Sequence, residues 1–355
     1  MRNSRHNNAL IPFGEARLIG WSRSMLYSGF NTLPRSVVRL ADSGVRWDNA
    51  DVIPLDLAFD LSELEICMNW IPISKLAEMG LTKGLVGNLA YWETKDGAVY
   101  HQNRKLRKAC VATFEVLADE YSFVARDREN IYHAWSLVKA ADRDTFEALG
   151  DFYFRDKLSA YAEFETSLKP LKGQDPASFT NLGSGYARDS SHGYFWGKPL
   201  RKCESPMTLK VIESRDDKTM DYAMDSELVY CEAAALKGAD LDSWQPRSRG
   251  FSLDRNTVFY CADRLAKADP HSWQHVSRCF SKDDNYVFYM NRRIKDAQSK
   301  SWVLLDSNYS TDGVRVYYGG KIVDDGDAGS FKISDDGEAS DQHGFFDSGV
   351  RRTSN

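Results

Sequence analysis

Apolar positions along most of the chain recur with a period far longer than that of a helix or a strand. Aspartates 29 residues apart each open a short polar turn, which leads into a run of β-branched and aromatic residues. A further aromatic residue stands nineteen positions after four of these aspartates. The aspartates are Asp225, Asp254, Asp283, Asp312 and Asp341, and the later aromatics are Trp244, Trp273, Trp302 and Phe331. A fixed interval of this length indicates a repeat architecture.

Every unit has the same order of strand-forming and turn-forming residues. β-Forming residues flanking Asp, Asn and Gly predict a hairpin. An Ala-Asp-x-x-Ser/Thr-Phe/Trp segment, as at 268–273, predicts a tight turn, and a final short strand leads into the next unit. One unit cannot bury its apolar face alone. We therefore predict a mainly β protein in which hairpin repeats of about 29 residues stack into a solenoid-like or propeller-like array, with Trp244, Trp273 and Trp302 in its core.

The repeat does not reach the N-terminus. Eight full units are predicted between about Tyr91 and Ile333, and a truncated ninth begins at Asp341. One unit is about four residues longer near 164–167. Residues 61–68 and 73–79 show partial helical periodicity instead. We therefore predict a small mixed α/β cap or domain over 1–86 and the repeat array over 87–355.

The recurring signature resembles that of the bacterial DKNYY-repeat family, which is named for an Asp-Lys-Asn-x-x-Tyr-Tyr motif. Residues 282–289 read Lys-Asp-Asp-Asn-Tyr-Val-Phe-Tyr, and weaker copies occur at 126–132 and 254–260. The resemblance covers about residues 90–352 and departs from the pattern at 156–161 and after Met207. It implies a surface or interaction protein, and such repeats also resemble proteins encoded beside polymorphic toxins.

Composition narrows the class of protein. The 46 Lys and Arg against 51 Asp and Glu give a net charge of −5, which argues against a nucleic-acid partner. No run of about 18 apolar residues is present, so no membrane span is expected. The first residues lack the apolar core of a signal peptide, which favours a cytoplasmic protein. The six cysteines form no C-x-x-C pair and are expected to be reduced and structural.

No catalytic motif emerges from the residue patterns. The repeated aspartates could act as metal or acid–base carboxylates, but one per unit beside a turn favours hydrogen bonding to the turn backbone. His271 and His275 have the spacing of a helical metal pair but flank Trp273 in a turn. We therefore expect no enzyme activity, no metal and no cofactor.

Residues that break the repeat are the candidate partner contacts. Trp135 and Trp196 stand at predicted hairpin tips, where each is either folded onto a neighbouring unit or exposed as an interface anchor. The longer hairpin contributes Glu163 and Glu165. An acidic stretch near the C-terminus is either a solvated edge or a surface for a basic partner, and its candidate contacts are Asp324, Asp325 and Asp327.

Two functions from different classes fit these patterns. The first is a non-catalytic protein-binding module, most concretely a cytoplasmic immunity protein that occludes the active site of a cognate secreted toxin with a basic toxin domain. The second is a structural or adhesive cell-surface repeat protein, which would need an export signal. An enzyme within the first 86 residues is a third alternative.

Overall fold

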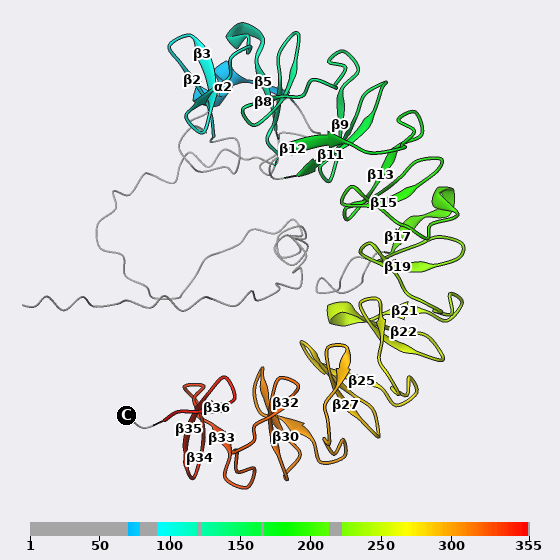
Figure 1. Cartoon of the computed structure of the whole chain (residues 1–355), viewed down its shortest axis with the longest axis vertical. Coiled ribbons are helices and arrows are strands. Elements are labelled where there is room, and N and C mark those ends of the chain that lie inside the picture. The colour runs from blue at the N-terminus through cyan, green and yellow to red at the C-terminus, as the bar shows by residue number, and fades with distance from the viewer. Residues whose placement is uncertain (1–69, 79–90, 119–121, 165–166, 213–221, 354–355) are drawn as a thin grey trace, which may run out of the picture. The chain divides into compact units, whose positions relative to one another are not determined.

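Nine small antiparallel sheets follow one another in chain order within the residues that the computed structural model describes, 70–78, 91–118, 122–164, 167–212 and 222–353 (Figure 1). The first has three strands: β2 (Trp92–Lys95), β3 (Ala98–His101) and β4 (Arg104–Lys105). The second has five: β1 (Trp70–Pro72), β5 (Glu115–Leu117), β6 (Val124–Arg126), β7 (Ile131–His133) and β8 (Ser136–Leu137). The mainly β class and the tandem array of hairpin sheets are therefore confirmed.

Each of the remaining seven sheets has four strands. They are β9 (Glu147–Gly150), β10 (Tyr153–Arg155), β11 (Ala160–Phe164) and β12 (Ser167–Pro170); β13 (Thr180–Gly183), β14 (Tyr186–Arg188), β15 (Gly193–Phe195) and β16 (Lys198–Pro199); β17 (Lys210–Ile212), β18 (Tyr222–Met224), β19 (Val229–Cys231) and β20 (Ala234–Ala235); β21 (Gln245–Pro246), β22 (Phe251–Leu253), β23 (Val258–Tyr260) and β24 (Asp263–Arg264); β25 (Gln274–Ser277), β26 (Phe280–Lys282), β27 (Val287–Tyr289) and β28 (Arg292–Arg293); β29 (Val303–Leu304), β30 (Tyr309–Thr311), β31 (Val316–Tyr318) and β32 (Lys321–Ile322); β33 (Lys332–Ile333), β34 (Ala339–Asp341), β35 (Gly344–Asp347) and β36 (Val350–Arg351).

The short strand that ends each sequence unit pairs forward rather than backward. Val303 of β29 stands opposite Thr311 of β30, so β29 is the first strand of the sheet that contains the next hairpin. Since each four-stranded sheet combines residues from two successive units, the chain interlocks neighbouring repeats.

The apolar core lies between successive sheets. In one such layer Phe280 and Val287 of one sheet pack with Trp302 and Tyr317 of the next. Trp302 and Trp244 are buried, as predicted, whereas Trp273 is only partly buried and packs against Phe251, their ring centroids 5.4 Å apart. Each layer thus uses side chains that only stacking can bury.

Buried aspartates close the hairpin turns. The Asp312 carboxylate accepts hydrogen bonds from the backbone N–H groups of Val314 and Arg315 through one oxygen. Its other oxygen accepts from the Gln298 N–H and the Tyr317 hydroxyl. The same turn contacts recur at the other repeat aspartates, Asp127, Asp156, Asp189, Asp225, Asp254, Asp283 and Asp341. The turn-binding interpretation of these residues is confirmed.

A short segment before residue 86 belongs to the first core layer. Helix α2 (Ile73–Glu78) lies within the segment predicted to be helical, and Ile73 and Leu76 pack against Trp92. Strand β1 pairs with β5 of the array. The other segment with helical periodicity, 61–68, lies outside the described residues. Three single 3-10 turns complete the elements: Val111–Thr113, Pro206–Thr208 and Ser248–Gly250. Within the described part of the chain, no helix is long and apolar enough to cross a membrane.

Candidate functional site

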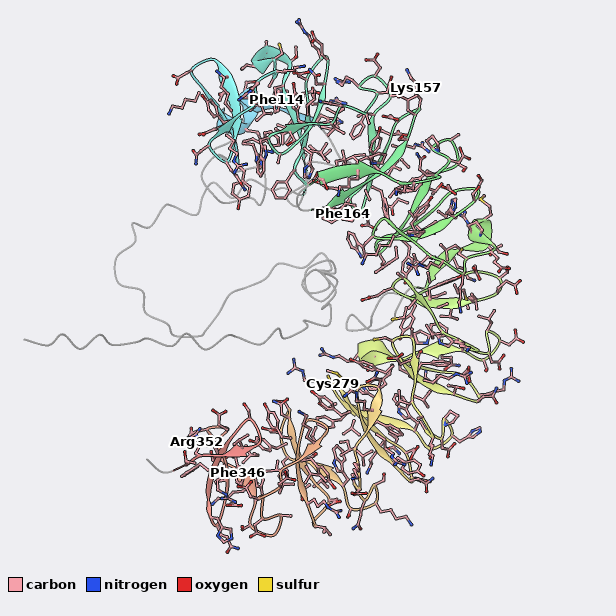
Figure 2. All side chains as sticks on the ribbon, in the orientation of Figure 1. Phe114, Lys157, Phe164, Cys279, Phe346 and Arg352 are labelled. Atoms are coloured by element: carbon pink, nitrogen blue, oxygen red, sulfur yellow. The ribbon has the colours of Figure 1, made fainter. Side chains whose placement is uncertain are left out.

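Trp135 is the most exposed tryptophan of the structure's described part, with 44% of its surface accessible. It lies in the turn between β7 and β8, at the end of the sheet opposite the aspartate turn. Figure 2 shows this polarity in the next sheet, where Lys157 of the aspartate turn and Phe164 of the other hairpin lie at opposite ends. The Arg104 guanidinium stacks over the Trp135 ring, 4.2 Å from its centroid. The turn and the cation together fix the orientation of an exposed indole.

Two more aromatic residues, Tyr91 and Phe123, contact the same buried ring as Trp135, that of His101. Tyr91 is 43% exposed and stacks on Phe123 with ring centroids 6.4 Å apart. The buried His101 ring lies beneath all three, with centroid distances of 6.0 Å to Tyr91, 5.6 Å to Phe123 and 5.9 Å to Trp135. We call Tyr91, Arg104, Phe123 and Trp135 the aromatic patch. It is assembled from the first two sheets and from Tyr91, which directly precedes β2.

A buried polar cluster supports the patch. Nε2 of His133 lies 3.1 Å from Oε1 of Glu163, which also accepts the Phe123 N–H, and Ser122 donates its hydroxyl to Oε2. Neither ring nitrogen of His101 has a hydrogen-bond partner among the described residues. Burial, and then the nearby His133, lower the pKa of His101 to about 4. His101 is therefore neutral near pH 7 and serves as an aromatic support.

Repeat geometry explains why these histidines meet. His101 is paired with Arg104 across its hairpin, and His133 is paired with Ser136. Tyr260 and Asp263 form the same pair in a later sheet. The two histidines thus occupy one structural position in successive sheets. Stacking places such positions side by side, which the linear sequence does not reveal until the register is known.

Trp196 is placed differently from Trp135. Phe195 pairs with Lys198 in the same way as His133 pairs with Ser136, so Trp196 stands one residue earlier in its turn than Trp135 does. The backbone of Trp196 has a φ of 46°. The ring packs against Phe152 of the preceding sheet, 5.4 Å between centroids, and over Gly185. A Cβ at residue 185 would lie 2.5 Å from this ring, so the site requires glycine. Of the two predicted alternatives, Trp196 adopts the one folded onto a neighbour.

The predicted acidic contacts are largely occupied within the protein. Glu163 is buried, so its prediction as a partner contact is wrong; Glu165 lies outside the described residues. Asp325 pairs with Arg351 at 3.0 Å. Asp327 accepts from the Ser330 hydroxyl and the Gln342 amide. Asp324 is exposed.

The candidate metal pair has other contacts. Nδ1 of His275 lies 2.9 Å from the Ser248 hydroxyl, and His271 is exposed. In the ranges described above, no group of three or more His, Cys, Asp or Glu side chains is arranged to hold a metal ion.

The fold defines a β-repeat protein made of stacked four-stranded sheets in which buried aspartates close the turns. The DKNYY family model matches residues 59–165, 161–292 and 222–348, and the chain belongs to this family. No curated protein and no solved structure shows a significant similarity to it.

Sequence reasoning found Trp135 but missed Tyr91, Arg104, Phe123 and His101. Trp135 was visible because a small or polar residue stands at its position in other units, such as Ala262. The other members come from segments up to 44 residues away, and only the stacking of two sheets brings them together.

Proposed function

We propose that this chain is a non-catalytic protein-binding module whose main contact is the aromatic patch. The single observation that carries the proposal is the composition of this patch: an exposed Trp and Tyr with an Arg stacked on the indole. Trp, Tyr and Arg dominate the residues that contribute most to protein–protein binding energy. The patch also lies at a hairpin end, outside the apolar core cluster that the two sheets share.

The support beneath the patch favours tight binding. Trp135 is held between Arg104 and the turn backbone, and His101 fills the space under it. A side chain already ordered in the free protein loses less entropy when a partner binds. Arg104 is exposed, and its guanidinium lies over the Trp135 ring. The patch therefore presents one guanidinium beside its exposed rings, which suits an acidic group on a partner.

The finer proposal is a bacterial cytoplasmic immunity protein that neutralises a cognate secreted toxin by covering its active site. Repeat proteins encoded beside polymorphic toxins provide the class-level support for this role. The partner is then a protein, with neither nucleic acid nor membrane involved. Its contact surface opposite Arg104 is expected to be acidic, even where the toxin domain as a whole is basic.

The test measures binding of the purified chain to the secreted toxin domain encoded in its neighbourhood. Trp135→Ala is expected to weaken binding by roughly 30-fold or more, since loss of a central aromatic anchor costs about 2–4 kcal/mol. Phe345→Ala is the matched control, because Phe345 is 51% exposed in the last sheet, away from the patch. Cells that produce the toxin should lose protection with the first variant only.

Three results would contradict the proposal. Equal effects of the two variants would show that the patch is not the contact. A large fall in melting temperature for Trp135→Ala would assign Trp135 to folding, because an exposed cation–π contact contributes only about 0.5–1 kcal/mol. Export of the chain to the cell surface without toxin binding would favour the structural or adhesive alternative.

A further inference from the structure

A hollow of about 420 Å³ opens at the edge of the array between two successive sheets. One wall is formed by Lys198 of β16 and by the following turn, Arg201–Lys202. The other wall is formed by Tyr230 of β19 and by the small residues Ala233 and Ala235 around β20. β16 and β20 are the last strands of neighbouring sheets, which lie near the labels β15 and β19 in Figure 1.

Ala235 stands at a position that an arginine occupies in the next sheet. In the next sheet Arg264 pairs with Phe259 in the register in which Ala235 pairs with Tyr230. Arg264 reaches back over the preceding turn and donates to the carbonyl oxygens of Lys237 and Gly238, at 3.0 Å each. The alanine at 235 cannot make this contact, so the equivalent turn at 201–202 stays uncovered.

The last junction of the array repeats the arginine contact. Arg351 pairs with Phe346 in the same register, and its guanidinium bonds the Asp325 carbonyl in the preceding turn. Two junctions thus fill this position with a guanidinium, and the junction at Ala235 leaves it open. Other junctions place Leu137, Pro170 or Ile322 in this register, so the arginine contact belongs to these two junctions and shows how a guanidinium can fill the position.

The charged residues that line the hollow are all positive, while the Asp225 carboxylate lies behind Tyr230 and accepts a hydrogen bond from its hydroxyl. Lys198, Arg201 and Lys202 are exposed, and within the described ranges none of their charged side-chain groups has a hydrogen bond or ion pair with another residue. No Asp or Glu belongs to its lining. Three cations on one side of a partly apolar hollow attract an anion. The electrostatic attraction is strongest where low-dielectric walls confine the electric field.

We propose that this hollow, the cationic hollow, binds a phosphate-bearing small molecule. A phosphate group carries a charge of about −1.5 to −2 near pH 7, which suits three unpaired cations better than a single carboxylate does. The Arg201 guanidinium supplies the planar fork that bonds two phosphate oxygens at once. The volume exceeds that of a phosphate group alone, so Pro199, Ala233 and Ala235 are left to contact an organic part of the ligand.

The test uses inorganic pyrophosphate as the probe and isothermal titration of the full chain, with no protein partner present. Arg201→Ala combined with Lys202→Ala should weaken binding at least tenfold, because two charge-assisted hydrogen bonds are lost. Ala235→Arg should abolish binding, since the new guanidinium can occupy the hollow as Arg264 does at the next junction. Lys237→Ala is the matched control and should leave binding unchanged.

The variant Ala235→Arg separates a site from general attraction, because it adds a positive charge and is still expected to lose the ligand. Retained pyrophosphate binding in this variant would overturn the proposal. So would an absence of binding by the wild-type chain at millimolar pyrophosphate, or equal affinity for succinate, a dicarboxylate that carries no phosphate. None of these results depends on whether the aromatic patch binds a protein.

Discussion

Replacing Asp312 by alanine tests whether the buried aspartates hold the repeat together. The substitution removes all four hydrogen bonds that its carboxylate accepts and leaves the hydroxyl of the fully buried Tyr317 without its partner. An unsatisfied buried donor costs about 1–3 kcal/mol. The Tyr317 hydroxyl and the Gln298 N–H both lose their acceptor, while the two turn N–H groups can turn to water at roughly 0.5–1 kcal/mol each. These terms add up to about 3–8 kcal/mol. Because the Gln298 N–H is only partly buried, we expect a loss in the free energy of unfolding near the lower end, about 3–5 kcal/mol.

The chain contains its own control for this experiment. At Asp254 and Asp283 the residue five positions on is Phe259 or Phe288, which has no hydroxyl to donate. Tyr317→Phe should therefore cost only about 0.5–1.5 kcal/mol, the worth of one hydrogen bond. Trp302, which packs in the same core layer as Tyr317, reports local unfolding by its fluorescence in urea. Such a local probe is needed because stacked repeats can unfold in parts.

Two outcomes would refute this reasoning. A loss below about 1 kcal/mol for Asp312→Ala would show that the turn does not depend on the carboxylate. Equal losses for Asp312→Ala and Tyr317→Phe would place the whole effect in the hydroxyl bond. Burial alone would raise the pKa of Asp312, but the N–H groups of Arg315, Val314 and Gln298 outweigh it and hold this pKa below its usual value. The contribution should thus be present above about pH 4 and fall as the carboxyl protonates at lower pH.

Three further predictions follow from the packing. Trp302→Ala should cost about 3–5 kcal/mol and the partly buried Trp273→Ala clearly less, as measured by chemical denaturation; the reverse order would contradict the burial. As pH falls from about 6.5 to about 4, His101 takes up a proton in the unfolded chain but stays neutral in the folded one, so the free energy of unfolding should fall by up to about 3 kcal/mol. His101→Phe should flatten this dependence on pH, and an unchanged dependence would exclude His101 as its source. Deleting 254–282 should leave a soluble β protein by circular dichroism, whereas deleting half of that range should not, because it breaks the register; equal solubility would refute the repeat boundaries.

The comparison between sequence and structure is clearest in the repeat itself. Residues at fixed intervals make contacts within their own unit or with the next one, as Asp312, Tyr317 and Trp302 do. Their roles as turn ligand and core residues could therefore be predicted from spacing. The pairing of β29 with the following hairpin could not, since a strand at a unit boundary has the same composition whichever neighbour it joins.

The candidate sites show what the sequence alone could not determine. Trp135 and Trp196 both interrupt the pattern at a hairpin tip, yet a shift of one position in the turn exposes the first ring and folds the second over Gly185. The sequence shows that Glu163 is acidic, which made it a candidate partner contact. Its burial against His133 depends on the stacking of two sheets.

The sequence by itself determined the period, the class of fold and the turn chemistry, because these depend on residues close together in the chain. The tertiary structure alone decided which side chains face each other across neighbouring sheets. That decision created the aromatic patch from Tyr91, Phe123 and Trp135 and left the cationic hollow beside Ala235. Contacts of this kind depend on the register between sheets, a quantity that no single repeat contains.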